Sequence, residues 1–306
     1  MAYTKPIEIK TISDYHIYME LHKPKHPLIS VLRFEDLKPN VNGNWRSIVN
    51  KFYCIALKKS FNSKMQYGQQ EYDFDEGVLA FVAPNQVIKV TPPTNEIAKH
   101  TGWLLIFHPD FFWNTSLTTK IKQYDFFGYQ LNEALHLSEK EEITLSHLIN
   151  NINEEYNQGI DKFSQEVMVT QIQLLLTYSE RFYQRQFITR KKINHSILVR
   201  VEGLLVDHFQ GKNILINGLP TVQIISEQLN ISPNYLSRLL KTLTGQSTKQ
   251  FIQDKVIEFA KEKLSTTDLT INEIAYEMGF EYPQSFSKLF KSKTNLTPLE
   301  FRVAFN

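Results

Sequence analysis

The chain has 306 residues, of which 42% are hydrophobic and 22% charged, with a formal net charge of +2. At about 100–200 residues per domain this length predicts two domains, each with enough apolar residues for a core. No stretch approaches the ~18 apolar residues of a membrane span, and no secretory signal is evident, so we expect a cytoplasmic protein with no membrane partner. A single cysteine, Cys54, excludes an internal disulfide and a multi-cysteine metal cage.

The first third of the chain is typical of β structure. Its short aromatic and β-branched runs are separated by turn residues, of which Ala83-Pro84-Asn85 and Asp75-Glu76-Gly77 are the clearest. The predicted strands are residues 28–34, 52–57, 78–82, 87–90 and 103–107. Several short strands at this close spacing favour a β-barrel or a sandwich.

From residue 137 the apolar spacing becomes helical. Ser138 and Glu141 have the spacing of a capping box, and a second helix is predicted over residues 161–184. Its apolar stripe belongs to the core, or it also presents an edge to a second subunit. The basic segment 181–192 interrupts the pattern and places a domain boundary near residue 190. From Lys191 onward 14 Lys and Arg oppose 11 Asp and Glu, a net charge of +3, against −1 before it.

The C-terminal part contains an internal repeat. Each copy has the pattern of a helix capped by threonine, a tight turn, and a second helix that begins with proline. The aligned segments are residues 221–229 with 270–278, and 236–241 with 286–291. These spacings predict two helix-turn-helix motifs, at about 221–243 and 270–293. The pattern of residues 249–264 predicts a helix that joins them rigidly.

The second helix of each copy carries a polar, cationic face opposite its apolar side. Neither face contains an acidic residue, whereas a merely solvated face usually mixes both signs of charge. The faces consist of Asn234, Ser237, Arg238 and Lys241 in the first copy, and of Gln284, Ser287, Lys288 and Lys291 in the second. Amide and guanidinium groups on such a face pair with base edges in a major groove. Two rigidly spaced copies could engage successive groove segments about 34 Å apart.

Residues 221–302 resemble the AraC/XylS family of transcriptional regulators. The resemblance rests on three motifs, which are residues 229–238 (LNISPNYLSR), 274–280 (IAYEMGF) and 286–302 (FSKLFKSKTNLTPLEFR). Three positions depart from the usual family pattern: Leu240 stands in place of Phe, Lys255 in place of Arg, and Asn295 in place of Gly.

The resemblance implies a sequence-specific, DNA-binding transcriptional regulator that activates transcription, with double-stranded DNA and RNA polymerase as partners. It implies base contacts from both polar faces, at Asn234, Ser237 and Arg238 in the first and at Gln284, Ser287 and Lys288 in the second. We assign Lys241 and Lys291, which lie nearer the helix ends, to phosphates.

The family resemblance also implies a cupin-like N-terminal domain that binds a small organic effector or forms a homodimer. The predicted fold is therefore α+β. A cupin-like β-barrel with a helical hairpin occupies residues 1–190. An all-α AraC-type DNA-binding domain, with two helix-turn-helix units joined by a linker helix, occupies residues 191–306. The segment Val82 to Ile88 is similar to the barrel hairpin of such sensor domains.

We expect no enzyme, no cofactor and no metal site. A metal-using cupin places clustered His and Glu on facing strands, and the sequence contains no His-x-His. His22 and His26 flank Pro24, which is unsuited to a ligand-bearing helix, and His108 is expected to be a hydrogen-bonding turn residue. Two alternatives stay open, a metal-dependent cupin enzyme with an appended helical domain and a protein interaction module. Metal content and the salt dependence of DNA binding separate them from a DNA-binding regulator.

Overall fold

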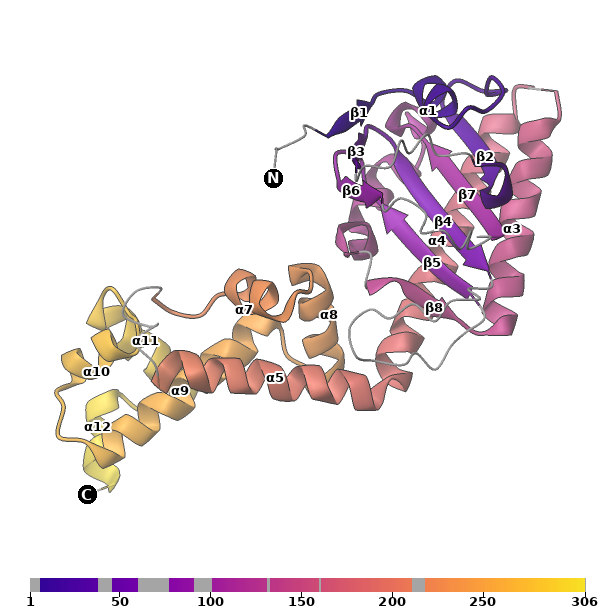
Figure 1. Ribbon diagram of the computed structural model, residues 1–306. Coiled ribbons are helices and arrows are strands. Elements are labelled where there is room, and N and C mark those ends of the chain that lie inside the picture. The colour runs from indigo at the N-terminus through magenta and orange to yellow at the C-terminus, as the bar shows by residue number, and fades with distance from the viewer. Residues whose placement is uncertain are drawn as a thin grey trace, which may run out of the picture. The chain divides into compact units, whose positions relative to one another are not determined.

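The computed structural model describes residues 6–37, 46–59, 77–90, 101–130, 133–159, 161–210 and 218–305. The contacts divide the chain into two compact units, Met1–Gln186 and Phe187–Asn306, which we take one at a time (Figure 1). Over these described ranges, no helix is both long enough and apolar enough to cross a membrane.

An antiparallel sheet of five strands forms the centre of the first unit. Its strands lie in the order β2-β7-β4-β5-β8, so β2 and β8 are the edges. The bounds are β2 Ile29–Arg33, β4 Tyr53–Lys59, β5 Gly77–Val82, β7 Thr101–Phe107 and β8 Leu135–Leu137. In the middle of the sheet Ile55 pairs with both Phe81 and Leu105. These central strands are rich in buried apolar residues, which suits positions covered on both faces.

A smaller mixed sheet lies beside it, with strands in the order β1-β3-β6. Strand β1 (Ile7–Ile9) runs parallel to β3 (Arg46–Asn50), and β6 (Val87–Val90) pairs antiparallel with β3. Helix α1 (Ile12–Tyr18) begins with a capping box between Thr11 and Asp14. The short strands are held in place by a shared apolar cluster, which includes Ile9, Ile12, Ile48, Phe52 and Ile106.

The turn at Ala83-Pro84-Asn85 forms as predicted, but it does not close a hairpin. Strand β5 before it and strand β6 after it belong to different sheets. The turn is fixed instead to the β3–β4 connection, where the Asn85 N–H donates to the Asn50 carbonyl at 2.7 Å and Lys51 Nζ to Asn85 Oδ1 at 2.7 Å. In the described part of the first unit the two sheets do not close into a barrel. The structure therefore supports the prediction of a strand-rich unit, but not that of a closed barrel.

Two long helices, α3 (Glu139–Asn157) and α4 (Ser164–Thr189), cover one face of the five-stranded sheet (Figure 1). The predicted capping box of Ser138 and Glu141 starts α3. Aromatic rings fill the space between sheet and helices; Phe126 lies 4.3 Å from Phe81 and 5.5 Å from Tyr183, measured between ring centroids. The shorter elements of this unit are η1 Phe34–Asp36, η2 Pro109–Phe112, α2 Leu117–Lys120, η3 Ile121–Gln123 and η4 Asp125–Gly128.

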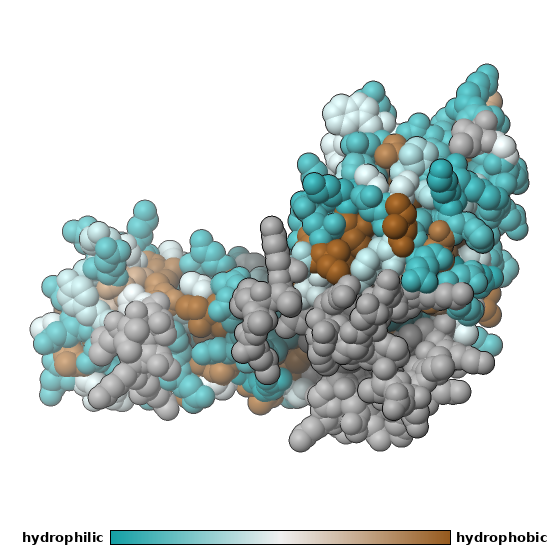
Figure 2. Space-filling model, turned by 45° about the horizontal axis from the view of Figure 1, so that its top comes forward, coloured by the Kyte–Doolittle hydropathy of each residue, from teal (hydrophilic) through white to brown (hydrophobic). Residues whose placement is uncertain are grey.

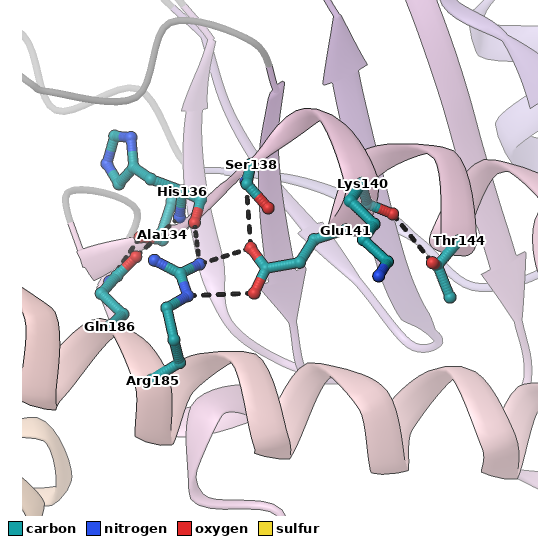
Figure 3. A network of polar contacts seen from close by, with 8 residues as sticks. All are labelled: Ala134, His136, Ser138, Lys140, Glu141, Thr144, Arg185 and Gln186. Atoms are coloured by element: carbon teal, nitrogen blue, oxygen red, sulfur yellow. Dashed lines mark hydrogen bonds and ion pairs between the residues drawn. The ribbon is translucent and has the colours of Figure 1, made fainter.

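Segment 181–192, expected to interrupt the helical pattern, is helical except at Arg190. In this segment Arg185 and Gln186 bind the edge strand β8 (Figure 3). Arg185 Nη2 donates to the His136 carbonyl at 2.7 Å, and the His136 N–H donates to Gln186 Oε1 at 2.8 Å. Arg185 also pairs with both carboxylate oxygens of Glu141, from Nε at 3.0 Å and from Nη2 at 2.6 Å. Helix α4 thus satisfies the backbone of a strand that is at the edge of the sheet formed by the described residues.

The second unit contains helices and turns but no strand in its described residues. Its helices are α5 Lys191–Gln210, α7 Val222–Leu229, α8 Pro233–Thr244, α9 Thr248–Thr266, α10 Ile271–Glu277, α11 Pro283–Thr294 and α12 Pro298–Phe305. Helix α9 occupies the predicted linker and packs against both α8 and α11. One continuous apolar core joins the two copies of the repeat, with Leu236 and Leu240 from α8, Val256 from α9, and Phe286 and Phe290 from α11.

Candidate DNA-binding interface

The two predicted helix-turn-helix motifs fold with the same order of elements. Helices α8 and α11 have the same length, begin with proline, and have bounds that differ by 50 residues. The threonine caps also form as predicted: Thr221 Oγ1 accepts from the Ile224 N–H, and Thr270 Oγ1 from the Glu273 N–H.

Both second helices end in a residue with left-handed backbone, Gly245 at φ 75° and Asn295 at φ 62°. Asn295 stands where the family usually has glycine, and as an asparagine it tolerates this conformation. Just before each of these residues a threonine hydroxyl donates back into the helix, from Thr244 to the Leu240 carbonyl at 2.7 Å and from Thr294 to the Phe290 carbonyl at 2.8 Å.

The repeat extends further than the sequence analysis recognised. Ser247 forms a capping box with Gln250 at the start of α9. At the start of α12, the Thr297 N–H donates to Glu300 Oε2 at 2.7 Å and the Glu300 N–H to Thr297 Oγ1 at 3.2 Å. Hydrogen bonds to the Glu300 carboxylate from the backbone N–H and then the side chain of Thr297 lower the pKa of this carboxyl below its usual value. The sequence signal for these caps is a Ser or Thr followed three residues later by a Gln or Glu. The two occurrences of this signal lie 50 residues apart.

The predicted polar faces lie at the surface, to different degrees. In α8, Asn234 and Lys241 are exposed, whereas Ser237 and Arg238 are half-buried. In α11 the exposed residues are Gln284, Lys288 and Lys291, and the half-buried one is Ser287. Neither helix contains an acidic residue. On the face of the molecule seen in Figure 2, hydrophilic side chains predominate and apolar ones form smaller groups. The two helices can therefore offer donors and positive charge to a polyanion without acidic residues of their own.

Two other lysines of this unit have structural partners. Lys293 at the end of α11 forms an ion pair with Asp254 of α9 at 2.7 Å. Lys255, which stands where the family usually has arginine, donates to Glu258 at 2.9 Å and lies 3.7 Å from Glu202 of α5. These pairs brace α11 and α5 against α9, so we separate both lysines from the polar faces.

The two copies differ at the residue that precedes the proline. In α8 this N-cap residue is Ser232, which is buried and accepts a hydrogen bond from the Tyr235 N–H at 3.2 Å. In α11 it is Tyr282, which makes no side-chain cap and is 62% exposed. Tyr282 was not among the predicted site residues, although it is opposite Ser232 when the two copies are aligned.

In the described residues no group of three or more His, Cys, Asp or Glu side chains could hold a metal ion. His108 behaves as predicted, since its Nδ1 accepts from the Asp110 N–H at 3.3 Å and starts η2. His26 has a similar local role, accepting from the Leu28 N–H at 3.1 Å. Cys54 is buried in β4, and burial raises the pKa of its thiol to about 12, which favours the inert, protonated form.

Comparison with known proteins agrees with this geometry. Residues 225–304 match a family described as a helix-turn-helix domain. The chain is 24% identical over 271 residues to YfiF, an uncharacterized HTH-type transcriptional regulator of Bacillus subtilis, a match that covers 85% of this chain and 82% of that protein. Two longer curated relatives are covered over only 8% and 21% of their length.

Two solved structures are similar to about a third of this chain. One is the C-terminal domain of AraT, a response regulator from Geobacillus stearothermophilus, with 31% identity, a TM-score of 0.31, and coverage of 35% of this chain and 84% of that one. The other is a transcriptional regulator with an AraC-type DNA-binding domain from Chromobacterium violaceum, with 21% identity, a TM-score of 0.31, and coverage of 36% and 93%.

The second unit therefore has a helix-turn-helix fold, which many DNA-binding proteins use. Residues 225–304 thus match the helix-turn-helix domain family, and over 85% of its length the chain is similar to an HTH-type transcriptional regulator.

Proposed function

We propose that this regulator binds DNA sequence-specifically and reads two successive major-groove segments, one with α8 and one with α11. The observation that carries the proposal is the duplication of an acid-free, hydrogen-bonding face on two helices of equal length. Helix α9 lies between the copies and packs on both, which would keep their separation fixed. A helix-turn-helix protein inserts its second helix into the major groove, so the exposed faces of α8 and α11 suit that role.

The residues divide by chemistry into base readers and phosphate binders. Arg238 and Lys288 can pair with guanine and Gln284 with adenine, while Asn234, Ser237 and Ser287 supply further hydrogen bonds to base edges. Lys241 and Lys291 are both exposed toward the ends of their helices, which suits contact with phosphates.

We propose that the first unit is a cupin-like domain with a regulatory role. It either binds a small organic effector or forms a homodimer. Support for a dimer comes from α4, where Val167 and Leu174 are exposed at a heptad spacing and Phe163 is exposed just before the helix. Apolar residues at this spacing pair helices from two subunits. Activation of transcription, and with it contact with RNA polymerase, is proposed from the family resemblance.

Selection of bound fragments from random duplex DNA tests the proposal. We expect enrichment of a site with two short conserved segments about one helical turn apart, and an affinity that falls as salt rises because phosphate contacts release counterions. No enrichment at moderate salt would overturn the proposal and favour a protein interaction module. Stoichiometric metal in the purified protein would favour the cupin enzyme instead.

A further inference from the structure

The N-cap of α11 departs from the symmetry of the repeat in a way that works against helix stability. Serine is among the most favoured N-cap residues because its hydroxyl accepts from a free backbone N–H, and Ser232 does this at the start of α8. Tyr282 occupies the same place at the start of α11 and provides no such bond. Every other cap of the repeat described above keeps a hydrogen-bonding or left-handed residue, so this exchange is the exception.

No contact among the described residues compensates for the missing cap at Tyr282. Its side chain is 62% exposed, and in the described part of the chain neither its ring nor its hydroxyl engages a partner. Ser232, by contrast, is 4% exposed. Pro283 follows at the first helical position and restricts the backbone there, so the aromatic ring leaves the helix start in a restricted range of directions.

The position of Tyr282 is at the leading end of the second recognition helix. In helix-turn-helix proteins the N-terminal residues of this helix contact base edges. Tyr282 directly precedes Pro283 and lies two residues before Gln284, which is assigned to a base. Glu281, exposed immediately before it, would repel a phosphate at this end of α11. The surroundings therefore favour a base edge over the DNA backbone for the tyrosine.

We propose that the ring of Tyr282 packs against the 5-methyl group of a thymine in the major groove and sets a base preference next to the one read by Gln284. The thymine methyl is the apolar feature that a major groove offers to an aromatic side chain. This inference rests on the proposed function, because it requires α11 to lie in the groove.

The test compares wild-type protein with Tyr282→Ser and Tyr282→Phe, using the DNA site that the wild type selects. Serine restores the capping residue of the first copy, so we expect the unfolding midpoint to rise by about 2–5 °C. The same variant should bind the site about three- to tenfold more weakly, which corresponds to losing one apolar contact of methyl size. A variant that is more stable yet binds less tightly cannot owe its weaker binding to unfolding.

Replacing one thymine at a time by uracil, which lacks the methyl group, identifies the contact. At one position the wild type and Tyr282→Phe should lose about three- to tenfold, while Tyr282→Ser should be indifferent. Tyr276→Ser is the matched control, since Tyr276 is another exposed tyrosine of this motif, on α10. It should retain the full response to uracil.

The outcomes separate this inference from the proposed function. If the wild type selects a site and Tyr282→Ser prefers the same bases with equal affinity, this inference is wrong and the proposed function stands. If Tyr282→Phe and Tyr282→Ser weaken binding equally for all sequences, the hydroxyl contacts phosphate and the inference is also wrong. If the wild type selects no site, both fail.

Discussion

Gly102 in β7 lies so close to Leu57 in β4 that a Cβ built on it would be 2.1 Å from the Leu57 carbonyl oxygen. The φ of Gly102 is +127°, which side chains of other residues rarely allow. We therefore expect Gly102→Ala to lower the free energy of unfolding by about 3 kcal/mol or more, because the central strand pair must separate. Urea unfolding of the purified variant measures this loss.

Gly245→Ala is the matched comparison in the second unit. Gly245 also has positive φ, +75°, but an added Cβ there meets nothing within 4 Å. Only backbone strain remains, so we expect a loss of about 1 kcal/mol. Equal losses for the two variants would contradict the contact at Leu57 as the cause.

Arg185→Ala should destabilise the first unit by about 2–3 kcal/mol. The substitution removes the ion pair with Glu141 and the hydrogen bond to the His136 carbonyl (Figure 3). The Glu141 carboxylate and the His136 carbonyl then lose the Arg185 donor at a partly buried site. Thermal unfolding gives the change. Arg181→Ala, at an exposed position of the same helix, should stay within about 0.5 kcal/mol of the wild type.

Acidification should weaken the fold through His16. Burial lowers the pKa of His16, although a hydrogen bond to the His22 carbonyl acts in the opposite direction. The Nε2 atom of His16 lies 2.9 Å from Ser30 Oγ. Burial also lowers the pKa of His26. The pKa of each histidine is lower in the folded protein than in the unfolded chain, where it is about 6.5. Below about pH 6.5 the unfolded chain therefore binds more protons than the folded protein does. Stability should be complete above that pH and decline below it.

Denaturant unfolding at a series of pH values between 8 and 5 follows this effect, with roughly half-unit steps around the unfolded histidine pKa of about 6.5. His16→Gln keeps a polar group in place but cannot gain the proton, so its profile should be flatter. A wild-type profile that does not fall on acidification would contradict the prediction.

The charged residues of the recognition faces should fall into two classes. Arg238→Ala and Lys288→Ala should each weaken binding to the selected site by about 1–3 kcal/mol and relax base preference at one position, whereas Lys241→Ala should weaken all sequences alike. Binding titrations against the selected site and a scrambled duplex distinguish the two. Lys293→Ala, which breaks the ion pair with Asp254, is the control and should leave base preference unchanged.

Local patterns predicted elements long enough to carry a pattern of their own, including strands whose partners are distant in the chain. The predicted strand 87–90 coincides with β6, and the predicted strand 78–82 lacks only the first residue of β5. The helix-turn-helix units followed from periodicity, caps and proline, which act within a few residues. The outward direction of a face such as that of Gln284 and Lys288 follows from the same periodicity, while their contact with bases stays a prediction.

Strands of only three residues that are held by distant partners were missed. Strand β8 has only three residues and depends on Arg185 and Gln186, about 50 residues further along the chain. Strand β1 is equally short and pairs in parallel with β3, a long-range contact that no local pattern reports. The hairpin predicted at residues 82–88 failed for the same reason: a turn signal gives the reversal of the chain but not the neighbour of each strand.

The packing of both helix-turn-helix copies on α9 constrains how the distance and the angle between the two copies can change. Because both copies pack on this single helix, inserting or deleting one residue within it would rotate the second copy by about 100° and shift it by about 1.5 Å. Under the proposed two-groove binding, a change in the spacing of the two half-sites would therefore require an insertion or deletion of whole helical turns in α9, not of single residues.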